Sequence, residues 1–413
     1  MKNKDRENII FAFKYNKSKY FVVTTLFLLS TSVYFSAHVE YLTLAFMLFG
    51  GMFISTGKKL SKDFIIIFLA LTVLNLANVI IFKFFPFRTV AGNYIRFLMP
   101  FFVIMLVGQY FPHYFVHVVK FFTIISFIFY IPANLIPGFN DLLQNIPKLL
   151  GTDPLENNHF IIYQVEYGKP WNTNIPIFRN SGPTGEPGEF AGYLMLAIIF
   201  EMIIKRKLWT KNNIIFTIAL LTTFSTTGYI AFFILLSAYY LLFSSIKSKI
   251  ILFPLSVILA FNIYFKYEFM YEKVDLQAQT VISAKSINDI PREGRLPNLI
   301  RNFRDSFDKP IFGKGRNFKT RYSNYEMMEA KEFSNNVASF PVQFGWPFFL
   351  FYSFLIVKGF KIFLYRNKLN TKYAYVLLFT IYTLAIGQGF LLTSVFILLL
   401  YFRSLYIGKR EYK

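Results

Sequence analysis

The chain has 413 residues, of which 55% are hydrophobic, 20% are aromatic and only 16% are charged. Soluble globular proteins carry about 25% charged residues, so this composition excludes an ordinary soluble protein. The net charge of +22 is typical of nucleic-acid-binding proteins, but the basic residues follow a pattern with another explanation, and no nucleic acid is predicted as a partner. Cysteine is absent, which excludes disulfide bonds and thiolate metal sites.

Long apolar runs recur along the chain. The run FIIIFLALTVLNLANVIIF at residues 64–82, for example, matches the ~20 residues that a helix needs to cross ~30 Å of hydrocarbon. The sequence therefore predicts an all-α, polytopic membrane protein with about twelve transmembrane helices. The predicted spans cover residues 21–37, 41–56, 64–82, 94–109, 114–136, 189–204, 213–226, 228–244, 250–267, 340–358, 373–387 and 389–406.

Lysine and arginine are divided unevenly among the segments between these spans. Segments on one side of the predicted membrane hold clusters of them, whereas the short loops on the other side hold almost none besides Lys83 and Arg88. Because basic residues accumulate on the cytoplasmic side of membrane proteins, we expect both termini to be cytoplasmic. The basic clusters lie at residues 2–19, 58–62, 205–207, 247–249, 358–372 and 409–413.

Two long segments, 137–188 and 268–339, remain outside the predicted spans, and the same charge pattern places both outside the cytoplasm. The sequence shows no internal repeat, low-complexity tract or soluble domain. We therefore expect one membrane domain, 1–413, with two elaborated extracytoplasmic loops. Long loops on the outer side are where chemistry on an exported substrate would take place.

The first outer loop ends in the polar stretch RNSGPTGEPGEF at residues 179–190. Its glycines and prolines predict a rigid series of turns at the membrane edge, which would hold Arg179 and Glu186 in fixed positions. Two interpretations remain open. Glu186 and Glu189 suit the positive N-terminal end of the following helix and would then only mark a helix start. An arginine and a glutamate on a rigid frame beside a bilayer are also typical of a binding or catalytic site.

The second outer loop contains GRLPNLIRNFRDSFDKPIFGKGRNF at residues 294–318. Its apolar residues recur at helical spacing after a proline, which predicts an amphipathic helix. Arg295 stands at the N-terminus of this helix, where a guanidinium and free backbone N–H groups together suit a phosphate or diphosphate. Arg301 and Arg304 precede Asp305 and Asp308 by four residues, so they would either bind the same ligand or form surface ion pairs.

Other polar residues lie near or within the predicted spans. Ser334 and Asn335 stand at the mouth of the span at 340–358, where they would bind substrate or cap a helix. Arg96 lies within the span at 94–109, and a charge inside a membrane predicts a functional site unless its side chain reaches the surface. The polar break FSTTG at 224–228 suits a tight turn between two helices or part of a site.

A metal site is not predicted. We expect no pair of the histidines to bind one zinc ion, because they are spread along the chain. The first predicted outer turn, AHVEY, offers only Glu40 and no acidic pair for a divalent cation. Catalysis would then depend on side-chain cations in place of a metal. The four histidines are His38, His113, His117 and His159.

In combination these features resemble the bacterial O-antigen polymerases and the related O-antigen ligases, which are glycosyltransferases that act on undecaprenyl-diphosphate-linked sugars. Residues 179–187 are similar to an R-x-x-G-x-x-x-E-P pattern before a central span, and Arg295 with the KPIFGKG turn at 309–315 is similar to the family's large outer loop. The stretch SNN…QFGW resembles the one that leads into the next span. Ligases have His-Asn there, whereas this chain has Ser334 and Asn335, which favours a polymerase.

The resemblance implies a GT-C-like glycosyltransferase of the bacterial plasma (inner) membrane that polymerises O-antigen, capsular polysaccharide or exopolysaccharide. It would join oligosaccharide repeat units on the outer face and release undecaprenyl diphosphate, without a metal or other cofactor. The implied partners are the undecaprenyl-diphosphate-linked oligosaccharide, the lipid bilayer, a flippase and a chain-length regulator. The residues assigned to catalysis are Arg179, Glu186 and Arg295, and those assigned to substrate binding are Arg96, Arg301, Arg304, Arg316, Ser334 and Asn335.

Two other functions remain open from the sequence alone. A ligase would use the same chemistry to move a finished glycan onto a lipid or other acceptor. A flippase or other transporter of the lipid-linked oligosaccharide would show charged residues deep in several spans and paired halves. The polar residues of this chain concentrate instead in the two outer loops, which favours an enzyme.

The predicted topology can be tested with reporter fusions. We expect a reporter fused after Gly168 or Tyr325 to read as extracytoplasmic and one fused after Lys207 to read as cytoplasmic, because the basic clusters set the inner side. Alkaline phosphatase, which is active only outside the cytoplasm, and green fluorescent protein, which is fluorescent inside it, provide the two measurements. A reversed pattern would contradict the assignment of both loops to the outer face.

Overall fold

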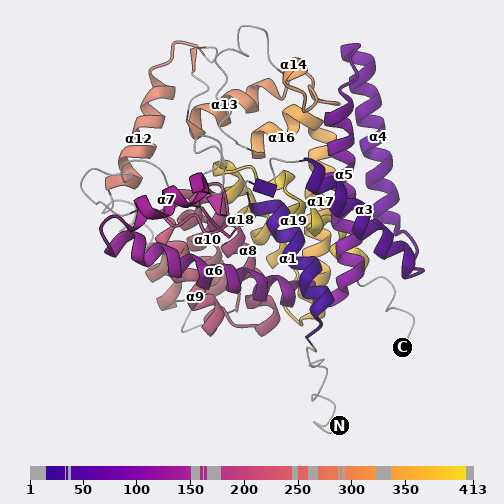
Figure 1. The fold of residues 1–413 in the computed structure, drawn as a ribbon. Coiled ribbons are helices and arrows are strands. Elements are labelled where there is room, and N and C mark those ends of the chain that lie inside the picture. The colour runs from indigo at the N-terminus through magenta and orange to yellow at the C-terminus, as the bar shows by residue number, and fades with distance from the viewer. Residues whose placement is uncertain are drawn as a thin grey trace.

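A computed structural model shows a chain built almost entirely of α-helices (Figure 1). The structure describes residues 15–32, 34–35, 39–149, 159–160, 162–164, 178–243, 250–258, 268–286, 289–290, 294–321 and 336–405. Within these ranges the only strands are β1 (His159–Phe160) and β2 (Tyr163–Gln164), an antiparallel pair in which position 159 faces position 164. The expectation of an all-α chain is confirmed.

Most described helices coincide with predicted spans. These are α1 (Lys17–Thr31), α3 (Val39–Ser55), α4 (Lys62–Phe82), α5 (Phe87–Val107), α6 (Phe111–Leu135), α8 (Pro187–Lys205), α9 (Lys211–Thr222), α10 (Thr226–Phe243), α17 (Trp346–Arg366) and α18 (Tyr373–Gly387). Residues 250–258 are also helical, and the short η1 (Gly108–Tyr110) separates α5 from α6. Helices outside the predicted spans are α7 (Phe139–Leu149), α12 (Glu268–Ile282), α13 (Arg295–Asp305) and α14 (Phe318–Arg321).

Four helical runs among the described residues are long and apolar enough to cross a membrane by length and composition. They are Lys62–Phe82, Phe87–Leu135, Pro187–Lys205 and Trp346–Arg366, and shorter apolar helices accompany them. Large apolar side chains on the outside of the bundle, such as Ile54, Ile80 and Leu350, are exposed, as expected where lipid replaces water. These are the features of an α-helical membrane protein, and the number of about twelve spans stays a prediction.

Two predicted spans are not continuous helices. The span at 340–358 is divided into α16 (Asn336–Phe344) and α17, because Gly345 between them has a φ of 80°. The span at 389–406 consists of η3 (Phe390–Leu392), α19 (Ser394–Ile397) and η4 (Leu398–Leu405), with Thr393 in an extended conformation between the first two. Both breaks lie within apolar sequence, so hydropathy alone could not show them.

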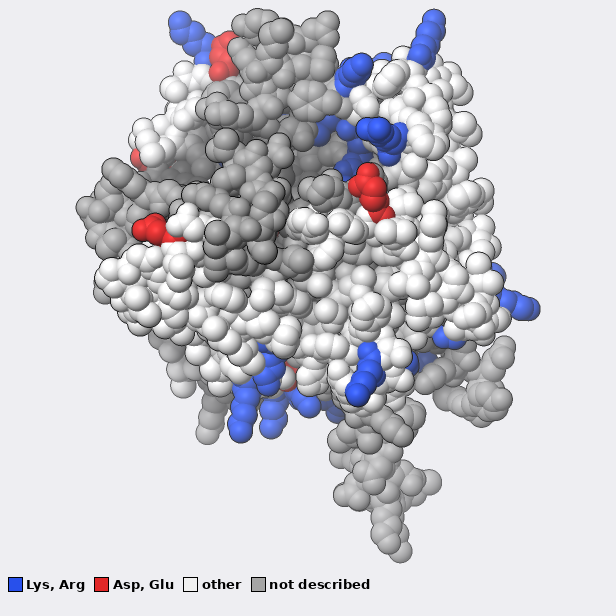
Figure 2. Space-filling model, viewed as in Figure 1, with Lys and Arg blue, Asp and Glu red and all other residues white. Residues whose placement is uncertain are grey.

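Several basic turns meet at one end of the bundle, which we call the lysine-rich end. The Lys58 ammonium donates to the Met105 carbonyl near the end of α5, at 2.6 Å, and the Lys19 ammonium lies 5.8 Å from the centre of the Tyr110 ring. Lys205 ends α8 on this side. Figure 2 shows blue side chains gathered along the lower edge of the molecule, and a second group in its upper part.

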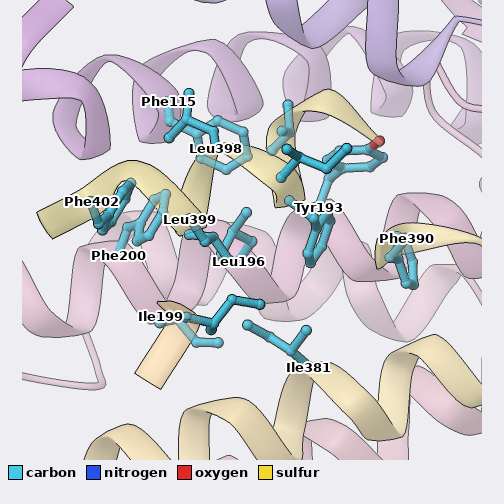
Figure 3. Packing of buried hydrophobic residues seen from close by; sticks show 14 of the residues in the cluster. Phe115, Tyr193, Leu196, Ile199, Phe200, Ile381, Phe390, Leu398, Leu399 and Phe402 are labelled. Carbon is cyan, nitrogen blue, oxygen red and sulfur yellow. The ribbon is translucent and has the colours of Figure 1, made fainter. Parts of the chain in front are cut away.

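Helix α8 is the centre of the bundle. In the membrane-length window of α8, 89% of residues are buried inside the protein, whereas the corresponding share for α4 is 17%. Figure 3 shows side chains of α8, among them Tyr193 and Phe200, surrounded by Phe115 of α6, Ile381 of α18 and Phe402 of η4. Because lipid is as apolar as these side chains, close packing rather than hydrophobic burial holds them together.

Helices α13, α14 and α16 lie over the end of the bundle opposite the lysine-rich end (Figure 1). The loop after α13 is held against the break between α16 and α17. The Trp346 amide donates to the Pro310 carbonyl at 2.7 Å, and the Gly315 amide donates to the Gln343 carbonyl at 3.0 Å. These bonds attach the second predicted outer loop to the helices beneath it.

Gly345 allows this attachment, and its replacement tests the arrangement. A Cβ there would lie 2.0 Å from the Ile311 carbonyl oxygen, and the positive φ of 80° would strain any other residue. We expect Gly345→Ala to lower the free energy of unfolding by at least about 2 kcal/mol, measured by thermal unfolding in detergent.

Gly51 of α3 supplies the matched control for that substitution. Nothing lies within 4 Å of a Cβ at this position, so Gly51→Ala should leave stability unchanged or raise it slightly through helix propensity. Equal melting temperatures for the two variants would contradict the tight contact at Gly345.

Candidate functional site

Glu186 and Arg295 come together at the end of the bundle opposite the lysine-rich end. Glu186 immediately precedes α8, Arg295 is the first residue of α13, and Arg295 Nη2 lies 3.7 Å from Glu186 Oε2. The two residues come from different outer loops predicted from the sequence. The structure therefore brings together two of the three residues assigned to catalysis.

The local sequence fixes the position of Glu186. It is the N-cap of α8 with an extended backbone, and Pro187 at the first helical position presets the following turn. The Thr184 hydroxyl bridges the carbonyls of Ser181 and Glu186, at 2.7 and 2.8 Å, and so closes the preceding turn. The Glu186 carboxylate makes no capping hydrogen bond to its own helix. This geometry favours a site over the simple helix-start interpretation.

Gln388 is a third member of the cluster, and the sequence interpretation missed it. It directly follows α18, it is buried, and its Nε2 donates to Glu186 Oε2 at 2.6 Å. Gly188 permits this contact, because a Cβ there would lie 2.5 Å from the Gln388 Nε2. The only sequence signal is the short polar break GQG between two apolar runs.

The cluster leaves one oxygen of the carboxylate available. Both contacts to Glu186 are made by Oε2, and no partner of Oε1 is found in the part of the chain that the structure describes. The Glu186 side chain is 60% exposed, whereas that of Arg295 is 22% exposed. Burial lowers the pKa of the Arg295 guanidinium below its usual value, while the nearby Glu186 carboxylate acts in the opposite direction. The guanidinium stays charged, because an arginine pKa is far above neutrality.

Arg179 occupies a different position. Its Nε donates to the Thr223 carbonyl at 3.0 Å and its Nη2 to the Phe224 carbonyl at 3.3 Å, just beyond the C-terminal end of α9. A cation there satisfies free carbonyls and offsets the negative end of the helix dipole. These contacts give Arg179 a structural role, and its predicted catalytic role has no contact with Glu186 to support it.

The neighbouring Asn180 also attaches the stretch at 179–190 to helices of the bundle. It is fully buried, and its side-chain amide donates to Ser126 of α6 and to Thr222 of α9, both at 3.1 Å. The stretch that begins with Arg179 is therefore attached to two helices before it reaches Glu186. This agrees with the expected rigid frame.

Arg96 is a cation without a partner among the described residues. It lies on α5, is only partly accessible, and has no hydrogen bond or ion pair with any described residue. Asn93, three residues earlier on the same side of α5, accepts a hydrogen bond from Arg316 at 3.0 Å. A largely buried arginine without a counter-charge inside an apolar helix is typical of a site for an anionic ligand.

Two more of the predicted substrate-binding residues, Arg301 and Arg304, lie on α13. Arg301 donates to the Ile290 carbonyl at 2.9 Å, and Arg304 lies 3.7 Å from the neighbouring Asp305. The expected pair of Arg304 with Asp308 is not formed, because Asp308 binds Lys314 at 2.8 Å. Ser334 and Asn335 lie outside the described residues.

The polar break at 224–228 comprises a short turn and the first turn of α10, which pack beside the site. The hydroxyl of Thr227 would be 2.5 Å from a Cβ at Gly387, next to Gln388, and a Cβ at Gly228 would lie 2.9 Å from that of Ala191 in α8. The turn therefore packs between α8 and the end of α18, which carry Glu186 and Gln388. Both interpretations of this break, a turn and a part of the site, have support.

The sequence analysis expected no two histidines to share a metal ion, but two of them lie close together on one helix. His113 and His117 lie one turn apart on α6, a spacing at which two histidines can bind one metal ion. However, no group of three or more His, Cys, Asp or Glu residues that could hold a metal is present among the described residues.

Comparisons with known proteins identify no relative. No protein-family model, no curated protein and no solved structure matches this chain. The function must therefore be argued from the site.

The structural role of Arg179 can be tested by substitution. Arg179→Ala should lower the free energy of unfolding by about 1–3 kcal/mol, because two carbonyls at the end of α9 lose their charged donor. Arg179→Lys should recover part of the loss, since a cation remains at the helix C-terminus. Thermal unfolding in detergent measures both effects. Arg304→Ala, at a half-exposed position, is the control and should change little; an Arg179→Ala variant as stable as that control would count against the capping role.

Proposed function

We propose that the protein is a membrane glycosyltransferase of the O-antigen polymerase type, which joins oligosaccharide repeat units carried on undecaprenyl diphosphate. The proposal includes a GT-C-like arrangement of about twelve spans and an outer location for the Glu186–Arg295–Gln388 cluster. The observation that carries it is the contact between Glu186 and Arg295, which places a carboxylate and a guanidinium together at the end of the bundle opposite the lysine-rich end.

The two groups suit the two needs of this reaction. The oxygen of an acceptor sugar hydroxyl forms a bond with the anomeric carbon of the donor, and the bond between that carbon and the diphosphate oxygen breaks. Undecaprenyl diphosphate leaves with both electrons of the broken bond. The Glu186 carboxylate takes the hydroxyl proton, and its uncontacted Oε1 is the atom suited to do so. Arg295 stabilises the charge that grows on the diphosphate.

The helix geometry supports the assignment of Arg295 to the diphosphate. Arg295 opens α13 after Gly294, so its guanidinium lies at the helix end that favours anions, although the Leu296 amide of the first turn already donates to Gln277 Oε1 at 2.9 Å and Pro297 has no N–H. A guanidinium can donate two parallel hydrogen bonds to phosphate oxygens, which a lysine ammonium cannot. Gln388 holds the Glu186 carboxylate in place by donating to its Oε2 at 2.6 Å.

The proposal predicts distinct effects for the two residues. Purified Glu186→Gln protein should bind the lipid-linked donor yet elongate it at least ~100-fold more slowly, because a lost general base costs ~10²–10⁴ in rate. Arg295→Ala should lose about 10²–10³ in rate, and Arg295→Lys should recover little. In vitro elongation of lipid-linked repeat units, with donor binding scored on the same preparation, measures both.

Lys309→Ala provides the control, since Lys309 is an exposed cation in the loop after α13, and it should elongate normally. The glycans of a deletion strain separate this function from transport. Loss of a polymerase leaves single repeat units at the surface, and loss of a flippase leaves none. Near-normal turnover in both Glu186→Gln and Arg295→Ala would rule out the proposed function.

A further inference from the structure

An apolar groove lies at the side of the bundle, between α9, α10 and the helix at 250–258. Its volume is about 330 Å³, within the range of ligand pockets, which is roughly 300–1,000 Å³. Most of its wall is aliphatic or aromatic, with side chains such as Leu220 of α9, Phe232 of α10 and Leu252 of the third helix. No residue of the Glu186–Arg295–Gln388 cluster lines it, so the groove is separate from the candidate site.

Most polar side chains in the wall of this groove already have partners within the protein. Trp209 Nε1 donates to the Tyr240 hydroxyl at 2.9 Å. The hydroxyls of Tyr229 and Ser256 donate to backbone carbonyls, at 2.5 and 2.7 Å. The wall therefore offers little to a polar ligand, and an apolar cavity does not hold ordered water. The part of a ligand that enters the groove must be apolar.

The groove opens among side chains that face lipid. Leu221 and Leu255 line it and are 50% and 54% exposed, and Ile218, one turn before Leu221 on α9, is 51% exposed. Large apolar side chains stay exposed in this way where lipid replaces water. An acyl chain of the bilayer can therefore enter from the side. It supplies the dispersion contacts that the wall of an empty cavity would lose.

Positive charge surrounds one end of the groove. Trp209 lines the groove from the turn between α8 and α9, and Lys207 and Lys211 lie two residues to either side of it, both exposed. This turn follows Lys205, at the lysine-rich end of the bundle. The sequence has no aspartate or glutamate from residue 202 to residue 267, a range that includes the whole wall of the groove. The charge at this end is complementary to an anionic headgroup.

We propose that this groove holds an acyl chain of an anionic phospholipid whose headgroup binds Lys207 and Lys211. Tryptophan at the level of the headgroups is typical of membrane proteins, and basic pockets between helices at the cytoplasmic side bind anionic lipids. The position of the charge selects a phospholipid over the donor of the proposed reaction. An undecaprenyl-linked donor would hold its diphosphate at the opposite end, beside Arg295. The bound phospholipid fills the space between the three helices and stabilises their arrangement.

Trp209 provides the measurement, because its side chain lies in the wall of the groove. The sequence has three tryptophans, so Trp171→Phe and Trp346→Phe leave Trp209 as the only one in a full-length chain. This chain is placed in nanodiscs of phosphatidylcholine with a minor fraction of phosphatidylglycerol that has brominated acyl chains. Bromine quenches tryptophan fluorescence only at close range. We expect more quenching than from the same fraction of brominated phosphatidylcholine, since only the anionic lipid binds the lysines.

Substitution of the two lysines tests the headgroup. Lys207→Gln together with Lys211→Gln should weaken the binding of phosphatidylglycerol about 5-fold for each lysine removed. Lys59→Gln together with Lys62→Gln is the matched control, because both lysines are exposed and removal of the pair changes the net charge equally. They lie beside α4, on the side of the bundle away from α9 (Figure 1), and this control should bind as before.

A second pair of variants tests the groove itself. Thr217→Phe places a ring in the groove and should reduce the quenching of Trp209 at least about twofold, because the ring excludes the acyl chain. Ile218→Phe is its matched control, since Ile218 is the next residue of α9 and does not line the groove. The control should be quenched as strongly as the parent chain.

Thermal unfolding of the unaltered chain in detergent gives an independent measurement. Added phosphatidylglycerol should raise the Tm above that with phosphatidylcholine, because a ligand that binds only the folded chain stabilises it. Equal quenching by the two brominated lipids, or an equal loss in both variants of either pair, would overturn the proposal. So would relief of the quenching by undecaprenyl phosphate as effective as that by unbrominated phosphatidylglycerol, which would assign the groove to the donor lipid.

Discussion

The burial of α8 on all sides is the constraint on which the candidate site depends. A helix that contacts lipid on one face can rotate or tilt to some degree, but α8 packs against α6, α9, α10 and α18 within the bundle. Phe200 alone meets aromatic rings from three other elements. Since interiors pack as closely as crystals, the N-terminal end of this helix has little freedom. Glu186 is at that end, so packing deep in the bundle fixes a carboxylate at its edge.

Polar groups in the described part of the chain divide into those with protein partners and those without. Arg179 and Asn180 have all the contacts expected of structural residues, with donors directed at backbone carbonyls and neighbouring hydroxyls. Arg96 and Asn75 have none in the described part of the chain. In a membrane protein an unpaired polar group costs more than it does in water, and its retention indicates a ligand. Under the proposed function, the anionic donor would supply the partner that Arg96 of α5 lacks among the described residues.

The sequence predicted the helices well because a long apolar run in a membrane must satisfy its own backbone hydrogen bonds, which leaves few alternatives to a helix. It could not show the break at Gly345 or the irregular segment after α18, since both lie in largely apolar sequence where hydropathy stays high. Nor could it show that α8 is the buried centre, because lipid and protein interior select the same side chains. Lipid-facing α4 is even more hydropathic than central α8.

The candidate site was predictable only in part, for a related reason. The polar stretch and the amphipathic helix identified Glu186 and Arg295, but their contact depends on tertiary packing. Arg179 shares the motif with Glu186, yet its guanidinium is directed at α9. Gln388 is a single polar residue beside an apolar run, and nothing in its local sequence distinguishes it from an ordinary helix end. A sequence motif identifies residue types, whereas the role of each residue depends on which groups its side chain contacts in the folded chain.

The net charge of +22 has two physical origins in this arrangement. Most of the described lysines lie at the lysine-rich end, which the predicted topology places in the cytoplasm. Arginines dominate the opposite end, at positions such as Arg96, Arg295 and Arg316, where the positive-inside pattern would disfavour them. There each is bonded or largely buried, and the guanidinium is the cation that suits both burial and bidentate phosphate binding. If the predicted topology holds, these arginines lie where it disfavours positive charge, and under the proposed function the lipid-linked diphosphate would supply the matching anion.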